Sequence, residues 1–170
     1  MKLKQWVKVL VALGIIFTNV GCDQITKETV RKEISSEEAI SVIDEHFVLT
    51  KVENTGAAMS MGENLPPFGK TIFLQFLPFV LLVLMFFYSI RKKQTSRINL
   101  VAISFIIGGG IGNLYDRVLY QSVTDFMYLE WGSFHTGIFN MADVSVVVGV
   151  LLLVFNLALL EIQRLRLKSS

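Results

Sequence analysis

Three aspartates lie within residues 112–145, together with asparagine and arginine side chains and between two strongly apolar segments. The sequence there is GNLYDR at 112–117, VTDF at 123–126 and FNMADVS at 139–145. An ionisable side chain at membrane depth costs roughly 3 kcal/mol or more, so its presence there is first interpreted as functional. This stretch is therefore the first candidate for chemistry.

Asp125 and Asp143 could act as a pair, in which one carboxylate takes a proton from water and the other gives one to a carbonyl oxygen. Two carboxyl groups that share a site cannot both ionise easily, so their pKa values separate and both roles become available. Each also has a structural explanation: Asn140 and Asp143 resemble a helix capping box, and Asp125 could be a loop acid. Because both acids flank predicted spans on the same side, the pattern favours a site.

Asp116 and Arg117 could form an ion pair that closes the third span. Arg117 could equally bind a phosphate or a substrate carbonyl. Asn113 could orient a catalytic carboxylate or join helices by hydrogen bonds. The sequence leaves these alternatives open.

Other kinds of catalysis have less support. A metal site built from Asp116, Asp125, Asp143 and His135 is conceivable, but the chain lacks a ligand spacing such as HExxH. No serine or lysine lies in a recognisable nucleophile motif, and Cys22 is the only cysteine. We therefore expect neither a metal nor a cofactor.

The composition is that of an integral membrane protein. Apolar residues make up 52% of the 170 residues and charged residues 18%, which is too apolar for one small soluble core. A membrane-spanning helix needs about 20 residues. The expected fold is membrane α-helical, with residues 1–170 as one integral membrane domain and four transmembrane helices at about 5–22, 68–90, 98–116 and 138–160.

The basic residues orient these spans. Ten of the 16 Lys and Arg residues fall in three flanks on one side, whereas Glu161 is the only acid there. The positive-inside rule therefore places both termini in the cytoplasm and the aspartates at the outer face. The net charge of only +2 gives no case for nucleic-acid binding. The ten basic residues are Lys2, Lys4, Lys8, Arg91, Lys92, Lys93, Arg97, Arg164, Arg166 and Lys168.

The outer segment, residues 23–67, is the one sizeable polar region. Residues 46–52 alternate well enough for a short strand, residues 35–38 indicate a turn or helix start, and residues 54–56 predict a turn. A segment of this size buries little core by itself. We expect a small extracytoplasmic, β-containing region on the outer membrane-facing surface of the bundle.

Five motifs in order resemble those of the lipoprotein signal peptidases, also called signal peptidase II. They extend from the first span to the fourth, so the resemblance covers essentially the whole chain. The motifs are DQITK at 23–27, NTGAA at 54–58, GNLYDR at 112–117, VTDF at 123–126 and FNMAD at 139–143.

The resemblance implies a membrane aspartyl endopeptidase that cleaves signal peptides from diacylglyceryl-modified bacterial prolipoproteins, before the lipidated cysteine. It implies that the catalytic residues are Asp125 and Asp143. It implies that substrate binding or orientation of this pair involves Asn54, Gly56, Asn113, Arg117 and Asn140. It also implies a supporting role for Asp23, Lys27 and Asp116.

It also implies a setting for the enzyme. The chain is expected to be a multi-pass protein of the bacterial inner membrane, with its active site at the extracytoplasmic face. Its partners would be diacylated prolipoproteins and membrane lipid. A monomer, inhibited by globomycin-type cyclic peptides, is expected.

Two other classes of function remain open. A basic start, an apolar run at 9–20 and Gly21-Cys22 resemble a lipoprotein signal peptide, which would make the chain a substrate; Asn19 and the three further spans weigh against this. A small transporter could use intramembrane acids as a proton relay. It would need acids spread across membrane depth, whereas these cluster at one face.

The charge bias predicts a topology that reporter fusions can test. A reporter active only in the cytoplasm should be active when fused after residues 95 and 168, and inactive after residues 40 and 130, because basic flanks stay inside. Activity after residue 130 would place the aspartates on the wrong side and contradict the four-span orientation.

Overall fold

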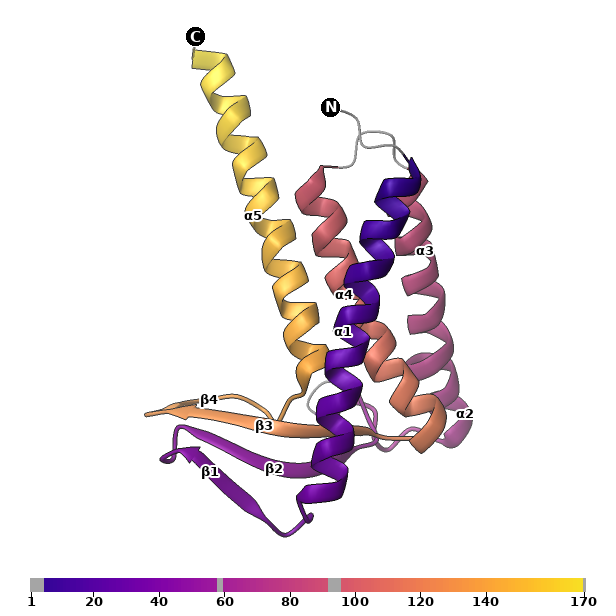
Figure 1. The fold of residues 1–170 in the computed structure, drawn as a ribbon, viewed down its shortest axis with the longest axis vertical. Coiled ribbons are helices and arrows are strands. Elements are labelled where there is room, and N and C mark those ends of the chain that lie inside the picture. The colour runs from indigo at the N-terminus through magenta and orange to yellow at the C-terminus, as the bar shows by residue number, and fades with distance from the viewer. Residues whose placement is uncertain (1–4, 58–59, 92–95, 170) are drawn as a thin grey trace.

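The computed structural model describes residues 5–57, 60–91 and 96–169 as a helical bundle with a small sheet at one end (Figure 1). Within these residues, four helical runs are long and apolar enough to cross a membrane: Gln5–Glu33, Pro67–Arg91, Arg97–Tyr120 and Met141–Leu167. The predicted four-span bundle is therefore confirmed. The elements in chain order are α1 (Gln5–Glu33), β1 (Ala39–Ile43), β2 (Phe47–Asn54), α2 (Pro67–Lys70), the π-helix η2 (Thr71–Phe76), α3 (Leu77–Arg91), α4 (Arg97–Tyr120), β3 (Val123–Trp131), β4 (Phe134–His135) and α5 (Met141–Ser169).

The first residues of α1 and the end of α5 lie at the same end of the bundle, and the sheet lies at the other (Figure 1). An even number of spans places both ends of the chain on the same side of the membrane, as this arrangement does. Some predicted inner basic positions, residues 2, 4, 92 and 93 and the side chain of Lys168, lie outside the described residues.

Helix α1 is longer than the predicted first span, residues 5–22. It continues to Glu33 because the sequence DQITKETVRKE contains no glycine or proline, and because Asp23, Lys27 and Val30 are buried against the rest of the protein. The non-helical part of the outer segment therefore begins after Glu33 rather than at residue 23.

The outer sheet is antiparallel, with strand order β1-β2-β3-β4. The sequence predicted β2, as residues 46–52, but not its partners. Strand β3 is rich in β-branched and aromatic residues, but it lies between the third and fourth predicted spans, where no strand is predicted from the sequence. Pairing of β2 with β3 sets Val52 opposite Asp125 and Asn54 opposite Val123. The sheet thus brings the Asn54 and Asp125 motifs side by side.

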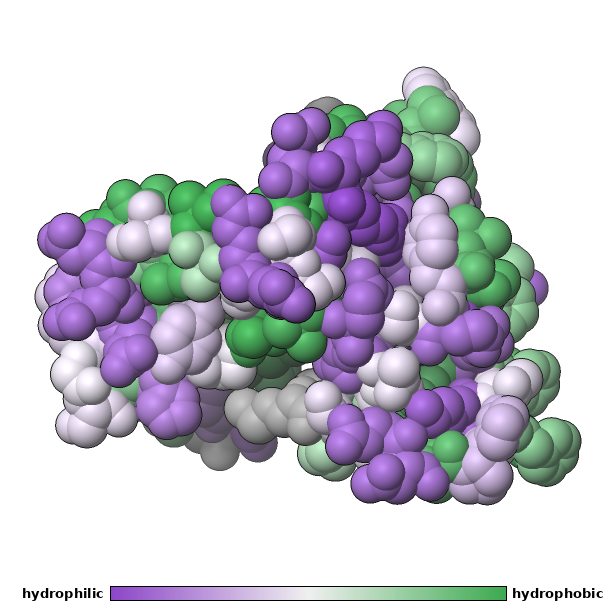
Figure 2. Space-filling model, turned by 90° about the horizontal axis from the view of Figure 1, so that it is seen from below, coloured by the Kyte–Doolittle hydropathy of each residue, from purple (hydrophilic) through white to green (hydrophobic). Residues whose placement is uncertain are grey.

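A small apolar cluster attaches the sheet to the bundle. Val30, in the last turn of α1, and Ile34, just after that helix, pack with Phe126 of β3. Figure 2 views this end of the molecule, where hydrophilic residues spread across the face and enclose apolar patches. This is the face on which polar chemistry can meet water.

Helix α4 is the centre of the bundle, and it contacts α1, α3 and α5. Its contact with α5 is very close: a Cβ built on Gly149 would lie 2.6 Å from the Ala102 carbonyl oxygen, and one on Gly109 would overlap the Ala142 carbonyl oxygen. In lipid, such small residues let helices approach and gain packing contacts. The tight packing expected from the glycines of the third span is therefore observed.

Replacing Gly109 with alanine should destabilise the protein, although alanine is the better helix former, because the added methyl group overlaps the backbone of α5. Overpacking costs about 1–3 kcal/mol. The measurement is the thermal unfolding midpoint in detergent. Gly14→Ala is the control, since nothing lies within 4 Å of a Cβ there; it should be neutral or stabilising by up to about 1 kcal/mol. Equal behaviour of the two variants would contradict the close α4–α5 contact.

Candidate active site

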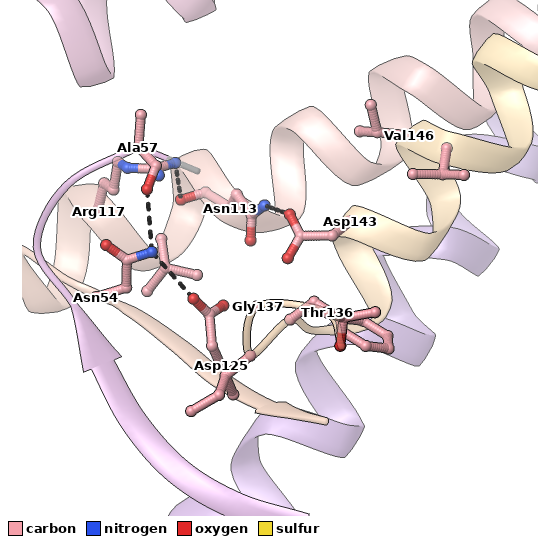
Figure 3. Close-up of a pocket in the computed structure, with 13 residues that line it drawn as sticks. Asn54, Ala57, Asn113, Arg117, Asp125, Thr136, Gly137, Asp143 and Val146 are labelled. Atoms are coloured by element: carbon pink, nitrogen blue, oxygen red, sulfur yellow. Dashed lines mark hydrogen bonds between the residues drawn. The ribbon is translucent and has the colours of Figure 1, made fainter. Parts of the chain in front are cut away.

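A cleft of about 330 Å³ opens at the sheet end of the bundle, and both candidate aspartates line it. Asp125 comes from β3 and Asp143 from the first turn of α5, and their carboxyl groups point toward the same space (Figure 3). The end of β2 contributes Asn54, and α4 contributes Asn113 and Arg117. The structure therefore brings residues from four elements to one cleft.

Asp125 is held by two amide groups. Its Oδ2 accepts a hydrogen bond from Asn54 Nδ2 at 3.0 Å, and its Oδ1 accepts one from Asn140 Nδ2 at 2.6 Å. Only 5% of Asp125 is exposed. Burial raises the pKa of this carboxyl from its usual 3.8 to about 6; the bond from Asn54 opposes the shift, and the nearby charge of Asp143 adds to it.

Asp143 has a different environment. Its Oδ1 accepts from Asn113 Nδ2 at 2.8 Å, and its Oδ2 accepts from the Asn140 backbone N–H at 3.1 Å. The Asp143 backbone N–H in turn donates to Asn140 Oδ1 at 3.0 Å, so the predicted capping box forms. The half-buried carboxylate thus sits at the N-terminus of α5, where the helix dipole favours negative charge.

Three groups that can only donate fix the orientation of the three asparagine amides. The Gly56 backbone N–H donates to Asn54 Oδ1 at 2.9 Å, and Lys27 Nζ donates to Asn113 Oδ1 at 2.9 Å. The Asp143 backbone N–H fixes Asn140 in the same way. Because each amide oxygen is occupied by a donor, each NH₂ group faces a carboxylate of the pair.

One further bond joins the two halves of the site. Asn140 Nδ2, which donates to Asp125, also donates to Asn113 Oδ1 at 3.1 Å. Asn113 donates to Asp143. The two aspartates are therefore linked through a continuous chain of directional hydrogen bonds, which fixes the position of one carboxyl group relative to the other.

Known proteins resemble this chain in sequence and in fold. Residues 15–159 match the sequence model of Signal peptidase (SPase) II. The chain belongs to the signal peptidase II family. It is 36% identical over 140 residues to the lipoprotein signal peptidase of Clostridium novyi (strain NT), covering 82% of this chain and 91% of that protein. It is 37% identical over 147 residues to the one from Clostridium tetani (strain Massachusetts / E88), covering 86% and 88%.

Two solved structures of bacterial membrane enzymes, at 2.3 and 1.9 Å resolution, have the same fold. The first has a TM-score of 0.75 and 29% identity and covers 92% of this chain and 90% of its own. The second has a TM-score of 0.74 and 28% identity, with 92% and 95% covered. The chain is thus a membrane aspartic endopeptidase of the signal peptidase II class.

Behind the cleft lies a buried cluster of charges. Lys27 Nζ is 2.8 Å from Asp23 Oδ2 and 2.9 Å from Asp116 Oδ2, and none of the three side chains is exposed. Arg31 Nη2 lies 3.0 Å from Asp116 Oδ1. Two cations therefore face two carboxylates, and Lys27 also reaches the site through Asn113.

The alternative of an Asp116–Arg117 ion pair is wrong, because Asp116 faces Lys27 and Arg31 instead. Arg117 Nη2 donates to the Gly56 carbonyl oxygen at 2.9 Å. A Cβ on Gly56 would lie 2.6 Å from the Ser60 carbonyl group, so this turn admits only glycine without rearrangement. Arg117 therefore holds the loop after β2 beside the cleft.

Two half-buried polar residues that join this cluster, Gln24 and Arg31, were not predicted. Gln24 Nε2 donates to Asp23 Oδ2, Gly112 O and Asp116 Oδ1 at 3.0–3.2 Å. Arg31 Nε donates to Thr124 Oγ1 at 2.9 Å, next to Asp125 on β3. The spacing of 23, 27 and 31 places three charged residues on one face of α1, and this signal could have identified Arg31.

The conceivable metal site does not form from the residues that the structure describes. No group of three His, Cys, Asp or Glu side chains among them is placed to hold a metal ion. Asp116 is used by Lys27 and Arg31, and His135 stacks near Tyr128 on the sheet.

The raised pKa of Asp125 predicts a pH-dependent effect of Asp125→Asn on stability. The folded carboxyl holds its proton more tightly than the unfolded one, so the wild type loses stability as the pH rises from about 4 through 6, whereas the variant does not. The difference between a pKa of 3.8 and one of about 6 corresponds to about 3 kcal/mol of folding free energy. The variant should therefore gain stability relative to the wild type by about that amount between pH 4 and 7.

Unfolding midpoints of both proteins in the same detergent, measured from pH 4 to 8, test this. A difference that stays constant with pH, or one that changes in favour of the wild type as pH rises, would contradict the raised pKa of Asp125.

Proposed function

We propose that this chain cleaves the signal peptides of diacylglyceryl-modified bacterial prolipoproteins, before the lipidated cysteine, with Asp125 and Asp143 as the catalytic pair. One observation carries the proposal. In this member of the family, two aspartates from different elements line one cleft, and oriented asparagine amides link them. The relatives named lipoprotein signal peptidase support the substrate class.

The two aspartates have unequal roles in the proposed mechanism. Asp143, at the helix N-terminus, is the ionised base that takes a proton from the attacking water. Asp125, buried and with its pKa raised to about 6, carries the proton that it gives to the scissile carbonyl oxygen. The water oxygen bonds to the carbonyl carbon, and the product is a neutral gem-diol.

The second step returns the enzyme to its starting state. Asp143 gives its proton to the amide nitrogen while a hydroxyl of the gem-diol returns a proton to Asp125. The carbon–nitrogen bond then breaks. The products are the carboxyl end of the signal peptide and the free amine of the lipidated cysteine, and no proton is gained or lost by the pair.

The remaining site residues position this pair. Asn54, Asn113 and Asn140 keep their NH₂ groups on the carboxyl oxygens, and Arg117 with Gly56 fixes the loop that borders the cleft. The supporting residues form a group that contacts the positioning residues rather than the two catalytic aspartates. These are Asp23, Lys27 and Asp116, which we assign to orienting Asn113 and the start of α5.

We further propose the setting in which the site works. The substrate signal peptide is itself a membrane helix whose lipidated cysteine lies at the outer interface, so the cleft should face outward from the inner membrane. The four spans and the outer region would serve one site in a monomer, with residues 1–170 as a single domain. Globomycin-type cyclic peptides would occupy the same cleft as the substrate backbone.

The transporter and lipoprotein alternatives gain no support. A proton relay needs acids at successive depths, whereas Asp23, Asp116, Asp125 and Asp143 are all part of one network at the sheet end. Cys22 lies within the continuous helix α1, immediately before buried Asp23. That helix supports the site as an intact element.

Asp125→Asn and Asp143→Asn should each abolish cleavage of a diacylated prolipoprotein by purified enzyme in detergent. Asparagine keeps the size of the side chain but cannot exchange a proton, and acid–base assistance is typically worth about 10²–10⁴-fold in rate. The control is Asp44→Asn on the exposed turn between β1 and β2, which should cleave at the wild-type rate.

An unlipidated prolipoprotein should be cleaved poorly or not at all by the wild type. More than about a tenth of wild-type turnover in either aspartate variant would contradict the pair. Full inhibition by a chelator would point instead to a metal-dependent reaction.

A further inference from the structure

A second cavity, of about 390 Å³, lies on the other side of Arg117 from the cleft. Arg117 lines both spaces and so forms part of the wall between them. The second cavity is also lined by Lys70 and Thr71 at the start of the second span, by Gln75 of η2 and by Gln121 at the end of α4. The proposed peptidase mechanism does not use this cavity.

The cavity is positively charged. Its lining includes two cations, Lys70 and Arg117, and no Asp or Glu. Among the described residues, no carboxylate lies within ion-pair distance of the Lys70 ammonium group, whereas Lys27, Arg31 and Lys32 on the same side of the bundle each have at least one. The three N–H donors of the Lys70 ammonium group therefore have no carboxylate partner in the part of the chain that the structure describes.

Three neutral polar side chains in the wall, those of Thr71, Gln75 and Gln121, already form hydrogen bonds. Gln75 Nε2 donates to Arg117 O at 3.1 Å and to Gln121 Oε1 at 3.3 Å, and Thr71 Oγ1 donates to Pro67 O at 3.1 Å. Arg117, in contrast, has a buried Nε without a hydrogen-bond partner among the described residues. Both cations of the wall thus keep a donor that no described group accepts, which indicates an anionic ligand.

The position of Lys70 identifies the kind of anion. Lys70 lies in the first turns of the run Pro67–Arg91, which is apolar enough to cross the membrane. Around the same turns Phe68, Phe73 and Phe76 are 77%, 57% and 63% exposed, as expected for side chains in contact with lipid. The cavity is therefore at the level where lipid headgroups meet the apolar region, and the abundant anion there is a phosphodiester.

We propose that this cavity binds the phosphodiester group of one membrane phospholipid, with Lys70 and Arg117 as its cations. The acyl chains would lie along the apolar side chains of η2 and α3. Gln75, in the π-helix η2, donates to Arg117 O near the end of α4, so these two elements are joined in the wall of the cavity.

Native mass spectrometry of the purified full chain in detergent tests this proposal. Phosphatidylglycerol should give one retained adduct, and diacylglycerol with the same acyl chains should bind at least about tenfold more weakly, because it lacks the phosphate. Lys70→Gln should weaken phosphatidylglycerol binding by about tenfold or more, and Lys70→Arg should restore it. Lys51→Gln removes one charge from β2 instead and should leave binding unchanged.

Four outcomes would overturn the proposal. These are equal binding of phosphatidylglycerol and diacylglycerol, no effect of Lys70→Gln in a variant with the wild-type unfolding midpoint, an equal loss in Lys51→Gln, and displacement of the lipid by millimolar inorganic phosphate. The last result would identify free phosphate as the ligand. Cleavage is not measured, so the outcome is independent of the proposed peptidase function.

Discussion

The buried ammonium group of Lys27 holds the outer end of the bundle together. It has three donors, and it places them on Asp23, Asp116 and Asn113 at 2.8–2.9 Å. A buried charge is tolerated only when it is paired, and removal of one partner of such a cluster typically costs about 3–5 kcal/mol. Because its partners come from α1 and α4, Lys27 fixes how these two helices meet beside the cleft.

The same cluster extends to α5 and to the sheet. Asp23 Oδ1 accepts from the Ala142 backbone N–H at 2.9 Å, one residue before Asp143, and Arg31 connects Asp116 to Thr124, one residue before Asp125. Each aspartate of the pair therefore follows a residue that the charge cluster holds. Such support fixes the geometry of the two carboxyl groups, which acid–base chemistry needs to within a fraction of an ångström.

The bilayer explains why the site needs this polar framework. Helices in lipid gain little from apolar contact, so packing of small residues and hydrogen bonds must fix their arrangement. Glycines let α4 and α5 approach closely, and polar pairs such as Ser145 with Asn19, at 2.7 Å, join α5 to α1 deeper in the bundle. These contacts between helices determine the shape of the cleft at the outer end.

The sequence by itself determined the four apolar spans, the clustering of acids between them, and the capping box of Asn140 and Asp143. These features depend on residues close together in the chain, where hydropathy and helix-end chemistry decide the outcome. The tertiary structure alone decided that 123–131 is a strand paired with β2, that Asp116 faces Lys27 and Arg31 rather than Arg117, and that Lys27 turns the amide of Asn113. Strand pairing and ion pairing between distant segments depend on which helices pack together, and neighbouring residues do not encode that choice.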